Sequence, residues 1–113
     1  MFQVMFNATA RVAAGAALLD GRMPGWEKKV NPQSLSIICP KSCVLAHVFG
    51  DYEAGLQALR LKRGPATGFG FHPSPHVDNT TPYHENLQLT RAWRDLLEER
   101  AAARSQSALS VAA

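Results

Sequence analysis

Two cysteines and two histidines have the spacing of paired metal ligands. Cys39 and Cys43 lie four residues apart, and so do His72 and His76. Zinc is usually held by four thiolate or imidazole ligands, and this order supplies both types in pairs, although the interval between the pairs is longer than in a zinc finger. The pattern predicts a candidate zinc site at Cys39, Cys43, His72 and His76. The alternative is that the cysteines are small buried apolar side chains near the start of a helix.

The cysteine pair also raises a redox interpretation, which its spacing does not favour. Thiol–disulfide motifs have two residues between the cysteines and begin a helix after a strand, where the helix dipole lowers the thiol pKa. Cys39 and Cys43 have three residues between them, and no strand–helix–strand pattern surrounds them. We expect no catalysis by these thiols.

Several side chains are of the types that transfer protons in general acid–base catalysis. They are His47, Asp51, His72, His76, Asp78, His84 and Glu85. None belongs to a known catalytic motif, because the chain has no G-x-S-x-G, no H-E-x-x-H and no phosphate-binding loop. The sequence therefore predicts a protein that is not an enzyme and that has no cofactor apart from the candidate zinc.

A short stretch in the middle of the chain has small residues at helix-turn-helix spacing. Ala46 and Gly50 lie four residues apart, and Leu56 and Leu59 follow. Small residues let two such helices approach closely. The second helix has two acidic residues and no basic one before Arg60, so it lacks the side chains that reach phosphates and base edges. Later basic residues offer a basic patch instead, and nucleic-acid binding stays the second hypothesis.

The composition is that of one ordinary globular domain. The chain has 113 residues, of which 46% are hydrophobic and 19% charged, and its formal net charge is +3. We expect a single domain at residues 1–104 and a flexible Ser/Ala-rich tail at residues 105–113. Two cysteines are too few for a disulfide-stapled secreted scaffold, and the apolar start lacks the basic residues of a signal peptide. The apolar stretches are too short to span a bilayer, so we expect a cytoplasmic protein.

The elements that must position these residues are predicted to be helices. Residues 4–19 are rich in alanine and contain no proline, which predicts a first helix that ends near Asp20. Gly15 in its middle is costly unless another backbone packs closely there. Trp26 follows a Pro-Gly turn and is predicted to fold back onto this helix as an anchor.

The middle of the chain is predicted to be an extended segment followed by further helix. Residues 35–38 favour extended backbone, but a strand without a partner is unstable, so this segment is expected to lie over the helices. Apolar residues recur at spacings of three and four over residues 45–59. They predict one kinked helix or two short helices, with Asp51 as the cap of the second.

The last third of the chain is predicted to be a loop and one helix. Glycines and prolines over residues 62–81 predict a long loop, with Phe69 and Phe71 holding it to the core. Thr81, followed by a proline, is a strong helix start. The predicted fold is mainly α, with three or four short helices around one core that contains Trp26 and Trp93.

Several short motifs follow one another along the chain. They are Gly15-Ala16-Ala17-Leu18-Leu19-Asp20, Pro24-Gly25-Trp26, Leu35, Cys43-Val44-Leu45, Phe49-Gly50-Asp51-Tyr52, Gly55-Leu56, Leu59, and Leu89-Thr90 followed by Trp93. As a set they resemble small proteins encoded by bacteriophages of actinobacteria, over residues 10–100. Ala46-His47 stands where that pattern has Gly-Gln. His72 and His76 lie in the variable loop and are local additions, so zinc binding is not expected to be a property of the family.

The resemblance implies an origin, and it carries over no catalytic residue. Small phage proteins of this kind commonly act by binding host or phage proteins inside the host. We therefore expect a non-catalytic accessory protein of the host cytoplasm that binds such a protein. A small DNA-binding regulator is the second hypothesis and a zinc-binding protein the third. Self-association is left open, and an apolar patch on the face of residues 2–12 would favour it.

Overall fold

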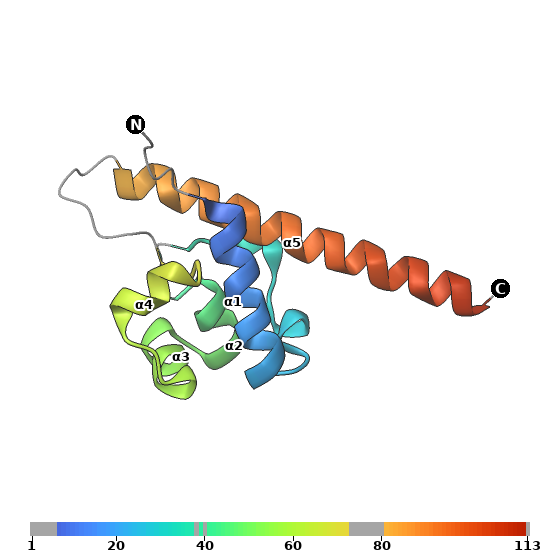
Figure 1. Cartoon of the computed structure of the whole chain (residues 1–113), viewed down its shortest axis with the longest axis horizontal. Coiled ribbons are helices and arrows are strands. Elements are labelled where there is room, and N and C mark those ends of the chain that lie inside the picture. Colours follow the sequence, from blue (N-terminus) through green and yellow to red (C-terminus); the bar gives the residue numbers. More distant parts are fainter. Residues whose placement is uncertain (1–6, 38, 40, 73–80, 113) are drawn as a thin grey trace.

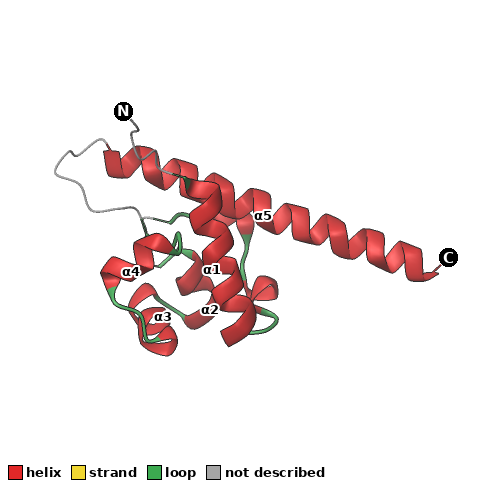
Figure 2. Ribbon diagram, in the orientation of Figure 1, coloured by secondary structure: helices red, strands yellow, loops and turns green. Residues whose placement is uncertain are grey.

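The computed structural model describes residues 7–37, 39, 41–72 and 81–112, which are mostly helical (Figures 1 and 2). The elements in chain order are α1 (Ala8–Arg22), the 3-10 helices η1 (Trp26–Lys29) and η2 (Pro32–Ser34), α2 (Val44–Phe49), α3 (Tyr52–Leu59), α4 (Arg63–Gly68) and α5 (Thr81–Ala112). No strand occurs among these described residues. The prediction of a mainly α-helical fold around one core is confirmed.

Three aromatic rings form the centre of the core. The rings of Trp26 and Trp93 meet edge to face with centroids 5.8 Å apart, and Phe71 stacks on Trp93 at 5.9 Å. The indole N–H of Trp93 donates to the carbonyl oxygen of Gly70 at 2.7 Å, and that of Trp26 donates to Asp20 of α1 at 3.0 Å. Each indole is thus buried and hydrogen-bonded, as large polar-edged rings require. Both predicted anchors are confirmed, including the return of Trp26 onto α1.

Helix α1 is displaced along the chain from its predicted position. It begins at Ala8 because the side chain of Asn7 accepts a hydrogen bond from the backbone N–H of Ala10 at 2.9 Å, which caps the helix. The predicted start at residue 4 was therefore wrong. The helix continues to Arg22, slightly beyond the predicted end.

The close approach expected at Gly15 is present. A Cβ atom added there would overlap the carbonyl oxygen of Phe69 and would lie 3.0 Å from the indole ring of Trp93. Glycine is required because the loop after α4 and helix α5 both press against α1 at this residue.

The middle of the chain forms two short helices, as one of the two alternatives predicted. Helix α2 ends at Gly50, whose φ of 105° lies in the region that glycine favours. The side chain of Asp51 then accepts a hydrogen bond from the backbone N–H of Ala54 at 2.7 Å and caps α3. The predicted cap is confirmed.

Part of the predicted long loop is a helix. Helix α4 tolerates Pro65 because this residue lies in the first turn, where a missing N–H costs nothing, and the hydroxyl of Thr67 donates to the carbonyl oxygen of Gly64 at 2.7 Å. Phe71 is fully buried and Phe69 half-buried, as predicted. Residues 73–80 of the predicted loop lie outside the described residues.

Helix α5 crosses α1 and extends well beyond the other helices (Figure 1). The longest dimension of the molecule is 54 Å, against 35 and 23 Å for the others. The helix continues past Arg104 to Ala112, and the flexibility expected of residues 105–113 stays a prediction. None of the described helices is long and apolar enough to cross a membrane.

Ion pairs join the second half of α5 to the C-terminal end of α1 and to η1. The guanidinium of Arg100 donates to both carboxylate oxygens of Asp20, at 2.8 and 3.0 Å, and lies over the ring of Trp26. Arg104 donates to Glu27 at 3.2 Å. Since the hydrogen bond from Arg100 lowers the pKa of Asp20, this carboxylate is charged at neutral pH.

Candidate functional site

The two cysteines predicted as metal ligands lie in the turn that leads into α2. The backbone N–H of Cys43 donates to the carbonyl oxygen of Cys39 at 3.0 Å, and both thiols are free. A hydrogen bond from the backbone of Lys41 lowers the pKa of Cys39, whereas burial raises the pKa of Cys43. Cys43 is fully buried in the core, which matches the alternative interpretation of this residue.

The two histidines of the candidate zinc site lie in a different part of the chain. The ring of His72 packs beside Tyr52 of α3, with centroids 5.5 Å apart, and His76 lies outside the described residues. Within the described part of the chain, no group of three or more metal-ligating side chains is close enough to hold an ion, so Cys39, Cys43 and His72 do not form one. A site completed by His76 stays a prediction.

The described acid–base candidates hold the fold together. The backbone N–H of Asn31 donates to Nδ1 of His47 at 2.9 Å, and burial lowers the pKa of His47, which keeps its ring neutral at pH 7. Asp51 caps α3. Glu85 is buried, and its carboxylate oxygen lies 4.0 Å from a guanidinium nitrogen of Arg11. The remaining candidate side chains lie outside the described ones: His76, Asp78 and His84.

Helices α2 and α3 pack closely, as the helix-turn-helix hypothesis expects, and α3 itself contains no arginine or lysine. A Cβ added at Gly55 would lie 2.6 Å from the Cβ of Leu45, so the two helices meet closely. Ala46 is buried in this pair. The exposed side of α3 carries Glu53 and Gln57, and arginine or lysine is the usual contact with phosphates and guanine.

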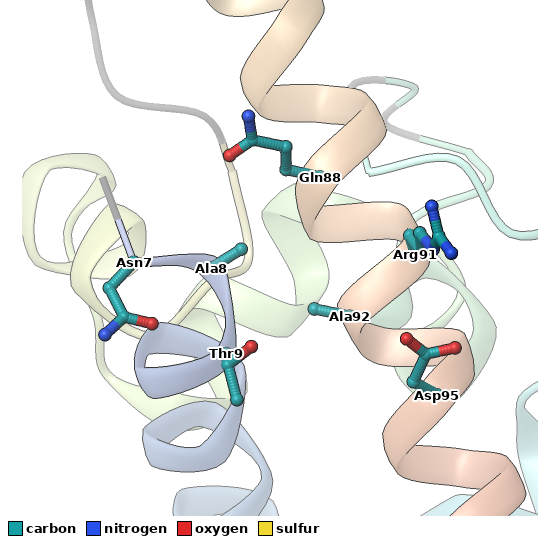
Figure 3. Close-up of a pocket in the computed structure, with 7 residues that line it drawn as sticks. All are labelled: Asn7, Ala8, Thr9, Gln88, Arg91, Ala92 and Asp95. Carbon is teal, nitrogen blue, oxygen red and sulfur yellow. The ribbon is translucent and has the colours of Figure 1, made fainter. Parts of the chain in front are cut away.

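An open hollow of about 510 Å³ separates the start of α1 from α5, and we call it the α1–α5 hollow (Figure 3). Its lining residues are Asn7, Ala8, Thr9, Gln88, Arg91, Ala92 and Asp95. Ala8 and Ala92 point toward one another across its floor, and the amide of Gln88 extends over Ala8. The small alanines leave the space between the two helices unfilled.

A second open hollow, of about 520 Å³, lies where the segment after η2 passes α5, and we call it the α5–Leu35 hollow. Its lining residues are Leu35, Ser36, Asn86, Leu87, Thr90, Arg91 and Arg94. Two hydrogen bonds join its walls, from the backbone N–H of Ile37 to Oγ1 of Thr90 at 3.2 Å and from Nε of Arg94 to the carbonyl oxygen of Pro32 at 2.7 Å. This hollow therefore has fixed sides.

Arg91 and Leu87 form the ridge of α5 beside these hollows. Arg91 lines both of them and is exposed. Leu87 is 51% exposed and is the one large apolar side chain, among those that the structure describes, that faces solvent to this degree. This surface was not predicted from the sequence. Its signal was that Leu87 lies two residues before Leu89 and therefore off the buried stripe of its helix.

A comparison of the chain with models of protein families, with curated proteins and with solved structures found no match. The surface of α5 must therefore be interpreted from its own geometry.

Proposed function

We propose that this protein is a non-catalytic accessory protein of an actinobacteriophage, which acts in the host cytoplasm by binding a host or phage protein through the outer surface of α5. The observation that carries the proposal is the exposure of Leu87 on a ridge beside two open hollows. An exposed leucine costs free energy in water, and because about half of the Leu87 side chain is still exposed, a partner that covers it would gain about 1 kcal/mol. The two hollows give that partner a surface of definite shape.

The chemistry of the hollows supports binding over catalysis. Their lining residues include no cysteine, histidine or lysine, and Asp95 is the one carboxylate among them. Acyl transfer and proton abstraction need a nucleophile or base held beside a second polar group in a site that excludes water. Two shallow, open surfaces with arginine and amide groups are better suited to a protein partner.

The positions that carry the phage resemblance support a shared framework. Gly15 receives the close approach of Phe69 and α5, Trp26 is the ring beneath Arg100, and Gly55 is where α2 and α3 meet. Trp93 lies at the centre of the core. Each of these residues is required by packing, so these parts of the pattern preserve a fold, whereas Leu87, Arg91 and Arg94 of α5 lie outside the pattern.

The proposal is tested by retention of partners from an actinobacterial lysate on the immobilised protein, followed by mass spectrometry. The wild type is compared with Leu87→Ser and with Gln57→Ser, which changes an exposed residue of α3. We expect a partner that wild type and Gln57→Ser retain equally and that Leu87→Ser retains about tenfold less, which corresponds to about 1.4 kcal/mol. Retention of no protein, or equal retention by all three, would overturn the proposal.

A DNA-binding regulator is the alternative, and the close α2–α3 pair is the observation that favours it. Basic side chains after α3, at Arg60 and Lys62, are exposed and would contact phosphates. Duplex binding measured at about 50 and 200 mM salt decides, because release of counterions makes such binding strongly salt-dependent. Salt-sensitive binding at about 1 μM or tighter would favour the regulator.

A further inference from the structure

The α5–Leu35 hollow contains a preorganised positive group. Nε of Arg94 donates to the carbonyl oxygen of Pro32 at 2.7 Å, and one of its terminal nitrogens donates to that of Leu35 at 3.4 Å. These bonds fix the guanidinium at the wall of the hollow while it keeps further N–H groups. An arginine that is already ordered loses less side-chain entropy when it binds a partner.

The charge of this hollow is of one sign. Arg91 and Arg94 line it, and no lining residue is acidic. Arg91 is exposed and forms no ion pair with any described residue, although Asp95 lies one helical turn away. An anion placed between these two guanidiniums would gain charge-assisted hydrogen bonds from Arg91 and from the N–H groups of Arg94 that do not bind Pro32 or Leu35.

The apolar part of the hollow adds a second requirement. Leu87 is 51% exposed at its edge, and Leu35 lines the opposite wall. A free inorganic anion would leave the leucine in water. A peptide segment with an apolar side chain next to a carboxylate would cover the leucine and satisfy both arginines at once.

We propose that the α5–Leu35 hollow binds an acidic, apolar segment of another protein, with a carboxylate on Arg91 and Arg94 and an apolar side chain against Leu87. This inference rests on the proposed function and adds the chemistry of the partner. It places the carboxylate contact on α5, beside the segment that follows η2.

The test is selection of a displayed library of random dodecapeptides on the full-length protein. Wild type is compared with Arg91→Glu and with Lys62→Glu, which makes the same change of charge at an exposed residue before α4. We expect wild type and Lys62→Glu to enrich peptides in which Asp or Glu neighbours Leu, Ile or Phe. Arg91→Glu should bind those peptides at least tenfold more weakly. Sedimentation of each variant, and competition by a 20-base-pair DNA duplex, are measured on the same samples.

Each other outcome overturns the inference. Enriched peptides without acidic residues, equal binding by Arg91→Glu, or no enrichment at all would exclude an acidic segment at this hollow. Self-association that Arg91→Glu abolishes would make a second copy of the chain the occupant, and displacement of the peptides by the duplex would assign the arginines to nucleic acid. Loss of the acidic preference with continued dependence on Leu87 in the lysate would refute this inference and leave the proposed function intact.

Discussion

Gly15 is the residue whose environment most restricts substitution. Its missing side chain allows the carbonyl oxygen of Phe69 and the ring of Trp93 to contact the backbone of α1. The sequence indicated that something must approach this glycine, because glycine in a helix interior otherwise costs stability. It did not indicate which groups approach, since both come from distant parts of the chain.

Replacement of Gly15 by alanine is expected to lower the free energy of unfolding by about 1–3 kcal/mol, because the new methyl group must displace backbone and an indole ring. Gly21→Ala is the matched control on the same helix, since an added Cβ there has no neighbour within 4 Å. That change should raise stability by about 0.5–1 kcal/mol through helix propensity. Urea denaturation of both variants measures the difference, and equal effects would contradict the described packing.

His47 is expected to make stability depend on pH. Its Nδ1 accepts a hydrogen bond from Asn31, and burial lowers its pKa below the ordinary value, so the folded state favours the neutral ring. The unfolded chain binds the proton first, near pH 6.5, and stability therefore falls as the pH is lowered from about 7 through that value. Denaturation midpoints of wild type and His47→Gln between pH 7.5 and 5 test this. A wild-type loss no larger than that of His47→Gln would show that the ring is not responsible.

At the scale of elements, Asp51 is what separates α3 from α2. Its side chain caps α3 at Ala54, and an alanine in its place leaves that backbone N–H without a partner. We expect Asp51→Ala to cost about 0.5–2 kcal/mol, and Asp51→Asn, which keeps an acceptor oxygen, to cost much less. Thermal unfolding of the two variants provides the measurement. Similar losses in both would mean that the carboxylate acts through its charge and not as a cap.

The elements that the sequence predicted correctly are those with local signals. The break between α2 and α3 follows from Gly50 and Asp51, and the start of α5 follows from Thr81 before a proline. Helix α4 was missed because its glycines and proline disfavour helix locally, and its formation depends on burial of Ala66 and Phe71. Tertiary contacts override weak propensity in this way.

The candidate site was less accessible to prediction for the same reason. Cysteines and histidines are candidate ligands or catalytic groups by residue type alone. In the structure, however, Cys43 is buried in the core, and His47 accepts a hydrogen bond from the backbone of Asn31. The walls of the α5–Leu35 hollow come from residues about fifty positions apart, so no local pattern brings them together. Its one local sign was Leu87, an apolar residue off the buried stripe of α5.

For the whole molecule, Arg100 joins the second half of α5 to the rest of the fold. This side chain joins α5 to Asp20 of α1 and covers the ring of Trp26. Since both charged groups are partly exposed, we expect Arg100→Ala to cost only about 1 kcal/mol and to lose most of that effect in high salt. Arg104→Ala, which removes one more exposed contact, to Glu27, should cost less. Urea denaturation at low and high salt compares them, and a larger loss in Arg104→Ala would contradict the described network.

The central claim is that the outer surface of α5 is where this protein meets its partner. It is tested most directly by photo-crosslinking in actinobacterial cells, with benzoyl-phenylalanine in place of Leu87 or, as a control, of Gln57 on α3. We expect discrete protein adducts from position 87 and few from position 57. Adducts from position 57 alone, or equal adducts from both positions, would contradict it.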